Sequence, residues 1–279
     1  ERLQEALKRA LEMREDALPA GATVPPPGGA RQPLVRQAAA SPSGDVQARW
    51  DEVEEFSPTP RIMRKNRLVS FFGGPEASSF DIMRTKFVQQ AKAKGAKRIV
   101  VTSPGPGCGK TTTTANLAFS LARQGDLRTI VVDIDLRRPN FGAIIGIQKA
   151  QQFSGALAHE ADPMDHMCRI GANLIVATNA VPVSNPSELI QSHSAQEMLA
   201  ELERHFDPDF ILFDAPPVLT SDDTIGFLEH CDAALIVAAA EQSSIEELDV
   251  TEAEVASVST VLGVVLNKCR YTATNYDYY

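Results

Sequence analysis

Short apolar runs that alternate with helical stretches are the feature of this chain that most restricts its fold. Six such runs follow one another in the last two thirds of the sequence: 98–102, 129–133, 173–178, 210–214, 233–239 and 262–267. Runs of this length that are apolar almost throughout are typical of strands buried on both faces. Parallel strands need helical crossovers, so the pattern predicts an α/β fold with a mostly parallel sheet and helices on both faces.

Two segments precede the first of these strands. Residues 78–94 predict a helix, because their apolar side chains recur at helical spacing and Gly95 stands at the end. Upstream, 61–72 carries four basic residues before a short apolar run. We expect this segment to be a solvated lead-in to a strand; the alternative is a basic patch that faces anionic lipid.

The N-terminal part of the chain differs in composition from the rest. Residues 1–17 place Leu3, Leu7, Ala10 and Leu11 on one face and predict an amphipathic helix. This helix is either a docking element for a partner or a frayed chain end. Residues 18–60 hold eight of the 18 prolines and predict a disordered linker. A P-loop domain over 61–267 and a tail over 268–279 complete the expected division.

Charge and cysteine content narrow the classes of function. The net charge of -9 argues against a nucleic-acid partner. The four cysteines form no C-x-x-C pair, which favours reduced thiols in a cytosolic protein over a zinc site or a disulfide framework. No run approaches 18 consecutive apolar residues, so we expect no membrane-spanning helix.

The segment SPGPGCGKTT (103–112) joins the first strand to a helix and predicts a phosphate-binding loop. Its glycines let backbone N–H groups turn inward, its lysine can reach the β- and γ-phosphates, and the next threonine can bind Mg²⁺. Pro104 stands where the usual G-x-x-x-x-G-K-[ST] pattern has its first glycine. The expected nucleotide-binding residues are Gly105, Gly107, Cys108, Gly109, Lys110, Thr111 and Thr112.

Aspartates end two of the apolar runs or follow them closely. Asp133 and Asp135 lie in the segment DIDLR, and Asp214 begins DAPP. A buried strand that ends in aspartate brings a carboxylate to the metal of a P-loop protein. Each aspartate alone could equally be a helix cap or a turn residue. Beside a phosphate loop, the three together predict a magnesium nucleotide site, with Thr111, Asp133 and Asp214 around the metal.

All four tyrosines lie in the last nine residues, after the last apolar run. A tyrosine normally buries its ring and hydrogen-bonds its hydroxyl group, which a terminal tail cannot do for four of them. We therefore expect these phenols to be presented to a partner or an active site rather than packed. They are Tyr271, Tyr276, Tyr278 and Tyr279.

The ordered set of the phosphate loop, DIDLR, NPSELI (185–190), DAPP and the tyrosine tail resembles the bacterial tyrosine kinase (BY-kinase) family over about residues 66–279. The resemblance implies an ATP- and Mg²⁺-dependent autokinase of capsule or exopolysaccharide synthesis, which phosphorylates its C-terminal tyrosines in trans. It also implies that Lys110, Asp133 and Asp135 are catalytic, with Asp135 nearest the incoming phenol.

The resemblance further implies partners and a location. It points to a transmembrane polysaccharide co-polymerase as adaptor, to self-association, and to a cytoplasmic protein at the inner face of the membrane that reaches the membrane only through its partner. One departure concerns assembly. The E-x-x-R-x-x-R motif of the family corresponds to Ser78, Asp81 and Arg84, so only the last arginine is kept.

Two other functions share parts of this pattern. Partitioning and division-site ATPases have the same fold, but they carry a lysine early in the loop where this chain has Gly105. A nucleotide-binding regulatory subunit of a polysaccharide export complex would bind ATP without transferring phosphate. The complete set of expected catalytic groups favours the kinase over both.

Overall fold

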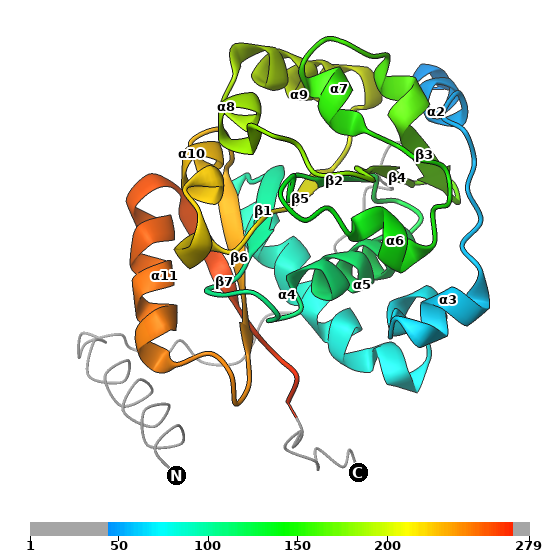
Figure 1. Cartoon of the computed structure of the whole chain (residues 1–279). Helices are drawn as coiled ribbons and strands as arrows, with labels where there is room; N and C mark the ends of the chain where they lie inside the picture. The colour runs from blue at the N-terminus through cyan, green and yellow to red at the C-terminus, as the bar shows by residue number, and fades with distance from the viewer. Residues whose placement is uncertain (1–43, 270–279) are drawn as a thin grey trace, which may run out of the picture. The chain divides into compact units, whose positions relative to one another are not determined.

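The computed structural model describes residues 44–269, and in this range seven strands form one sheet (Figure 1). The strand order is β3-β4-β2-β5-β1-β6-β7. Every neighbouring pair is parallel except β3 and β4, which confirms the mostly parallel sheet. The strands are β1 (Arg98–Thr102), β2 (Thr129–Asp133), β3 (Met167–Ile170), β4 (Leu174–Ala177), β5 (Phe210–Asp214), β6 (Ala233–Ala239) and β7 (Thr260–Asn267).

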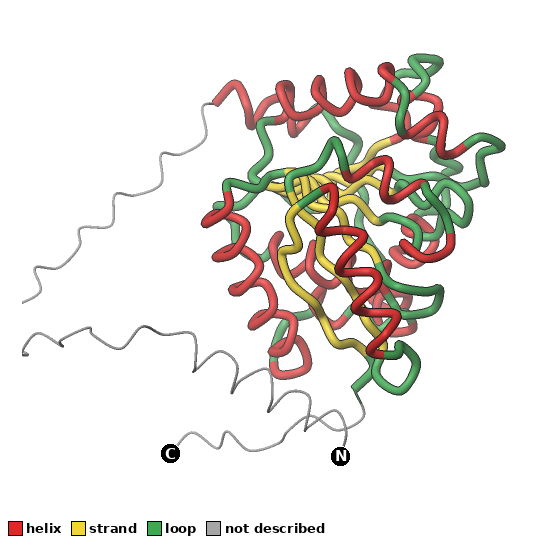
Figure 2. The backbone as a smooth tube through the Cα atoms, turned by 90° about the vertical axis from the view of Figure 1, so that its left-hand side faces the viewer, coloured by secondary structure: helices red, strands yellow, loops and turns green. Residues whose placement is uncertain are grey.

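Helices cover both faces of the sheet, as expected (Figure 2). One face carries α3 (Pro60–Lys65), α4 (Ser78–Lys94), α5 (Lys110–Ala122) and α6 (Phe141–Ile145). The other face carries α2 (Gly44–Asp51), α7 (Phe153–Leu157), α8 (Pro186–Ile190), α9 (His193–Phe206), α10 (Asp223–Leu228) and α11 (Ile245–Val258). Single 3₁₀ turns are η1 (Val69–Phe71), η2 (Pro75–Ala77), η3 (Pro163–His166) and η4 (Val218–Thr220).

Local sequence explains most of these elements. The strands β2, β5 and β6 are buried at every position, as their uninterrupted apolar runs predict. The expected helix over 78–94 is confirmed, and it ends at Gly95 with a left-handed φ of 65°. Within 44–269, none of the helices has both the length and the apolar composition needed to cross a bilayer.

The linker expected over 18–60 needs correction in its second part. Residues 44–51 form α2, which packs on the sheet through Val46 and Trp50. The Trp50 side chain is fully buried, and its Nε1 donates a hydrogen bond to the Phe206 carbonyl at 2.7 Å. Apolar residues at helical spacing allow this part of the chain to pack on the sheet. The high proline content of residues 18–60 as a whole masked this local pattern. The amphipathic helix expected over 1–17 and the rest of the linker lie outside the described residues.

The strand lead-in expected over 61–72 is also wrong. This segment forms α3 and η1, and Met63 and Leu68 are buried in the core next to α4, α5 and α6. Asn116 of α5 holds the segment in place, because its side chain accepts from the Ser70 N–H at 3.0 Å and donates to the Arg67 carbonyl at 3.1 Å. A proline at the first helical position and buried apolar residues stabilise a helical turn here.

Sequence reasoning missed the edge strand β3. It has four residues and pairs antiparallel with β4, to which a short turn with Gly171 at φ 63° connects it. A run of four residues that includes Arg169 is too short for its periodicity to indicate a strand.

Candidate nucleotide and phosphoryl-transfer site

The sheet order brings the expected motifs together at one edge. The strand β5 lies between β2 and β1, and Asp133 and Asp214 are paired positions of the β2–β5 ladder. The phosphate loop leaves the carboxyl end of β1, which pairs with the other side of β5. In parallel sheets, ligands bind beyond the carboxyl ends of the strands. All three motifs therefore meet at the edge where a ligand is expected.

The backbone of the phosphate loop requires glycine at two positions. Gly107 has φ 81° and Gly109 has φ 89°, both in the left-handed region, whereas Gly105 does not adopt a positive φ. A Cβ atom on Gly109 would also lie 2.3 Å from Nδ2 of Asn267. Gly109 directly precedes α5, so the loop delivers its N–H groups to the positive end of a helix. This geometry fits a bound phosphate.

Neighbouring segments hold the loop in place. The Thr102 hydroxyl group donates to the Pro216 carbonyl at 2.7 Å, and the Val218 N–H donates to the Ser103 carbonyl at 2.9 Å. On the other side, Asn267 Nδ2 donates to the Cys108 carbonyl at 2.9 Å. The DAPP segment and the end of β7 thus fix both sides of the loop, and a change in either would displace it.

Lys110 and Asp135 form an ion pair at the carboxyl end of the parallel strands, with Nζ and Oδ2 2.7 Å apart. Both side chains are nearly buried, at 13% and 10% exposure. Burial alone would lower the pKa of Lys110, but attraction to Asp214 and Asp135 outweighs it and the pKa is raised. The lysine is therefore firmly cationic, and it faces the carboxylate that the resemblance places next to the phenol.

Asp133 and Asp214 are buried carboxylates in an unfavourable environment. Burial first, and then repulsion from Asp214, hold the pKa of Asp133 well above its ordinary value. Burial also raises the pKa of Asp214, although the nearby Lys110 favours its charged form. Asp133 accepts hydrogen bonds from the N–H groups of Asn140 and Phe141 at 3.2 and 3.0 Å. The site holds more negative charge than Lys110 balances, which favours a cation.

The donor set fits magnesium bound together with a nucleotide. In the described part of the chain, no three His, Cys, Asp or Glu side chains converge well enough to hold a metal by themselves. Mg²⁺ characteristically binds one or two carboxylates and completes its shell with water and substrate phosphates. The Thr111 hydroxyl group hydrogen-bonds to Asp214, so these two ligand candidates are already adjacent.

A cavity of about 500 Å³ opens in front of these residues. This volume lies within the range of about 300–1,000 Å³ that small-molecule sites occupy. Its lining includes Gly107, Gly109, Lys110, Thr111, Thr112, Asp135, Arg137, Arg138, Pro216 and Pro217. The structure therefore brings most of the expected residues together around one space. The four tyrosines lie outside the described residues.

Cys108 contributes to the loop through its backbone. Its side chain is only 4% exposed and contacts the Ser243 hydroxyl group at 3.5 Å, away from the residues that line the cavity. Reactive cysteines are typically more accessible than this. The contact with Ser243 ties the phosphate loop to the segment that follows β6.

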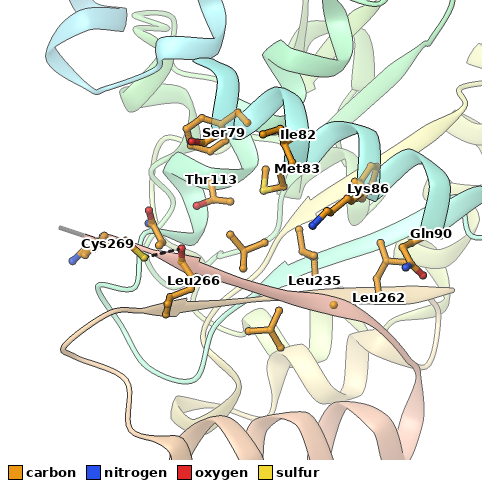
Figure 3. A pocket seen from close by; sticks show the side chains of 17 residues that line it. Ser79, Ile82, Met83, Lys86, Gln90, Thr113, Leu235, Leu262, Leu266 and Cys269 are labelled. Carbon is orange, nitrogen blue, oxygen red and sulfur yellow. Dashed lines mark hydrogen bonds between the residues drawn. The ribbon is translucent and has the colours of Figure 1, made fainter. Parts of the chain in front are cut away.

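A second hollow lies between α4 and the edge strand β7 (Figure 3). Met83 of α4 faces Leu235 of β6 across it, and Ile82 is 60% exposed at its rim. Thr113 and Asn267 line the end nearest the phosphate loop. The hollow is mainly apolar, so it offers surface for a planar base or an apolar side chain rather than for phosphate.

Sequence reasoning missed the residues that support the DIDLR segment. Arg137 forms two hydrogen bonds with the Asp223 carboxylate, at 2.6 and 2.9 Å, and the Ser187 hydroxyl group donates to the same carboxylate. Burial would raise the pKa of Asp223, but the bonds from Arg137 and Ser187 outweigh it and lower the pKa. The sequence signals were the arginine in DIDLR and the segment NPSELI, which contains Ser187, whereas Asp223 had none; the two partners of Arg137 are 50 and 86 residues away.

The residues at the expected assembly motif make contacts within the chain. Asp81 accepts hydrogen bonds from Ser120 at 2.6 Å and from Arg84 at 3.3 Å, and it forms an ion pair with Arg123. The hydrogen bond from Arg123 is the main reason that the pKa of Asp81 is lowered. Both charged residues at these positions are thus engaged with α5 and the residue after it.

Comparisons with known proteins agree with this geometry. Residues 94–277 match the ParA family model, described as NUBPL iron-transfer P-loop NTPase. Tyrosine-protein kinase CpsD of Streptococcus pneumoniae serotype 4 is 31% identical over 186 residues, which cover 64% of this chain and 79% of the relative.

Solved structures show the same fold. The crystal structure of the chimerical protein CapA2B2 has a TM-score of 0.66 at 26% identity and covers 81% of this chain and 98% of that chain. The septum site-determining protein MinD of Pyrococcus horikoshii, complexed with Mg-ADP, has a TM-score of 0.53 at 24% identity and covers 63% and 72%.

Proposed function

The chain belongs to the bacterial tyrosine kinase (BY-kinase) family, and we propose that its nucleotide site transfers the γ-phosphate of ATP to tyrosines of the C-terminal cluster. It is a protein-tyrosine kinase, as its relatives are named, and in this proposal it acts in capsule or exopolysaccharide synthesis. The acceptors in this proposal are Tyr271, Tyr276, Tyr278 and Tyr279. The tail of one copy reaches the site of another, so transfer occurs in trans.

The Lys110–Asp135 pair is the observation that carries the proposal. In the kinase, Lys110 leaves Asp135 to contact the β- and γ-phosphates, together with the loop N–H groups. Asp135 is then free to orient the phenol and accept its proton, which a group of pKa about 10 does not release by itself at neutral pH. The phenolic oxygen forms the new P–O bond as the bond to ADP breaks.

Thr111, Asp133 and Asp214 hold Mg²⁺ in this proposal, directly or through water. The ion supplies charge compensation at the phosphoryl group when it is bound. The raised pKa values of Asp133 and Asp214 support this assignment, because a cation would relieve the repulsion between them. Thr112 follows Thr111 along the first turn of α5 and lines the same cavity.

Purified chain incubated with Mg-ATP tests the proposal through phosphotyrosine detection. We expect wild-type protein to become phosphorylated and Lys110→Met to lose the signal. Lys92→Met, an exposed lysine on α4, is the matched control and should behave as wild type. A variant with all four tyrosines changed to Phe should still turn over ATP but carry no phosphotyrosine. These four are the only tyrosines of the chain, so this variant serves as the blank of the assay. Wild-type protein that turns over ATP without gaining phosphotyrosine, even with the adaptor present, would overturn the assignment of the acceptors.

Assembly and membrane recruitment are further parts of the proposal. Trans transfer needs self-association, and Asp81 and Arg84 are occupied within the chain, so we place the contacts between copies elsewhere. A transmembrane co-polymerase serves as adaptor and keeps the kinase at the inner face of the membrane. The likeness to the chimerical protein CapA2B2 supports such a partner. The relative EpsB of Ralstonia nicotianae, of which the match covers only 27%, is long enough to carry an adaptor segment of its own.

The alternative with the same fold is a partitioning- or division-site-type ATPase. Gly105 occupies the position of its lysine, although a Cβ atom there would meet nothing within 4 Å. The chain therefore has no candidate for lysine-dependent dimer chemistry. ATP turnover without phosphotyrosine, in the presence of the adaptor, would favour that ATPase or a regulatory subunit over the kinase.

A further inference from the structure

Four exposed basic side chains lie within residues 61–67, on the segment that precedes α4. In α3, Arg61, Arg64 and Lys65 stand at positions i, i+3 and i+4, which lie on the same side of a helix. Met63 points to the core instead and is fully buried. Arg67 lies one residue beyond the C-cap Asn66, and all four basic residues are exposed. We call these four residues together with Phe72 the basic face.

The basic face has no carboxylate partners among the residues that the structure describes. Residues 56–75 contain no Asp or Glu, in a chain of net charge -9. Three acidic residues on adjoining segments have cations of their own: Glu54 pairs with Lys149, Glu55 pairs with Arg169, and Asp81 pairs with Arg84 and Arg123. Like charges at helical i, i+3 and i+4 spacing destabilise a helix, and no carboxylate within 44–269 pairs with these cations to offset the repulsion.

An exposed aromatic ring accompanies the cations. Phe72 is 39% exposed, and the Arg64 guanidinium group lies 4.3 Å from the centre of its ring. Asn116 of α5 anchors the backbone of this segment through Ser70 and Arg67, so the face is presented by a fixed scaffold. Cations beside an exposed aromatic ring are the combination found at membrane interfaces, where the ring enters the headgroup region.

We propose that the basic face docks this chain directly onto an anionic lipid bilayer. The resemblance implies membrane contact only through a protein partner, and this surface adds a second, direct contact. Each basic residue close to an anionic surface strengthens binding roughly fivefold, so four give roughly several hundredfold. The acidic remainder of the chain is repelled by the same surface, which fixes the orientation: α3 faces the membrane.

Vesicle co-sedimentation of the whole chain, without nucleotide, tests this. Wild-type protein should bind vesicles of equal parts phosphatidylglycerol and phosphatidylcholine, and should not bind phosphatidylcholine alone. Binding should be lost at about 1 M NaCl, where the Debye length is about 3 Å. The variant Arg61→Gln, Arg64→Gln, Lys65→Gln, Arg67→Gln should bind at least roughly a hundredfold more weakly. Phe72→Ala alone should weaken binding several-fold.

The matched control removes four other exposed cations, Lys86, Lys92, Lys94 and Arg204, by substitution with Gln. It has the same net charge as the first variant and should keep most of the vesicle binding. An equal loss of vesicle binding in both variants would overturn the proposal, because net charge alone would then explain the binding. Far-ultraviolet circular dichroism checks that both variants are folded.

A phosphotyrosine peptide is the competing ligand for a basic surface. A peptide of residues 268–279 phosphorylated on its tyrosines distinguishes the two. If wild-type protein ignores anionic vesicles but binds this peptide, and the Arg61, Arg64, Lys65, Arg67 variant does not, the membrane proposal is wrong and the face recognises phosphorylated tails.

Discussion

The surroundings of the carboxylates in the nucleotide site raise their pKa values, whereas the surroundings of Asp81 lower its pKa. Asp133 and Asp214 lie side by side at the ends of paired strands, and the pKa of each is raised, with burial as the main cause. Asp81 lies on α4 among Ser120, Arg84 and Arg123, and its pKa is lowered by the hydrogen bond from Arg123 and the charges nearby. One cluster has too few cations and the other has enough.

Asp223 shows that burial alone does not make the difference. Its side chain is 2% exposed, close to the exposure of Asp214, yet its pKa is lowered because Arg137 and Ser187 bind it. A buried carboxylate with its own arginine is a structural element. A buried carboxylate pair that shares one lysine is incomplete until a cation and a ligand arrive, and such perturbed groups mark functional sites.

The largest effect should come from removing one charge of the incomplete cluster. We expect Asp214→Asn to reduce phosphotyrosine formation by about a hundredfold to a thousandfold, because the proposed Mg²⁺ site would lose a charged ligand. The free energy of unfolding without nucleotide should instead rise by about 1 kcal/mol, since a repelled buried charge disappears and Oδ1 can still accept from Thr114. Kinase assays and urea denaturation measure the two effects.

A fall in the unfolding free energy of Asp214→Asn would contradict this comparison. It would mean that the charged carboxylate stabilises the empty site, as an ordinary paired group does.

A smaller effect is expected at the Arg137–Asp223 pair. Arg137→Ala leaves a buried carboxylate with Ser187 as its remaining side-chain donor and should lower the free energy of unfolding by about 2–3 kcal/mol. In a double-mutant cycle with Asp223→Asn, the coupling energy should be about 1–2 kcal/mol. Urea denaturation of the four proteins measures it. A coupling energy near zero would show that Arg137 does not stabilise Asp223, and Asp223 would then resemble Asp133 and Asp214.

Much of the fold could be predicted from the sequence, because strand burial leaves a direct signal. The apolar runs before Asp133 and Asp214 gave both strands, and Gly95 gave the end of α4. Trp50 was missed although Val46, Trp50 and Val53 have helical spacing, since the prolines around them dominated the composition. Short segments also escaped detection, because four to six residues carry too little periodicity.

The candidate site was predictable in its members but not in its contacts. A phosphate loop and aspartates at strand ends identify Lys110, Asp135 and Asp214 by type and position. Strand order then decides which of them touch, and neither the Lys110–Asp135 pair nor the Arg137–Asp223 pair can be read from spacing. Contacts between residues 25 to 86 positions apart depend on tertiary packing, which local sequence does not specify.

The pH dependence of stability should separate the two kinds of carboxylate. The folded pKa values of Asp133 and Asp214 are raised above the unfolded value of about 3.9. The contribution of these two groups to the free energy of unfolding is fully present below about pH 4. It is lost as the pH rises through their pKa values in the folded state. For Asp81 and Asp223 the folded values are lowered, so their contribution is present above about pH 4 and is lost as the pH falls through them.

As the pH rises from about 4 towards 8, the stability advantage of Asp214→Asn over wild type should therefore grow. Thermal unfolding without nucleotide over this range measures it. An advantage that stays constant would show that Asp214 does not titrate in this window.

The smallest effect is expected at Asp81. Asp81→Asn removes a partly exposed ion pair, so the free energy of unfolding should fall by only about 0.5–1 kcal/mol, and kinase activity should stay at the wild-type level. High salt should reduce the difference, because the pair is reached by solvent. Denaturation at low and high ionic strength, with phosphotyrosine assays at several protein concentrations, tests both points. If activity drops most at low protein concentration, Asp81 also serves the contact between copies, and its network within the chain is then only one of two arrangements.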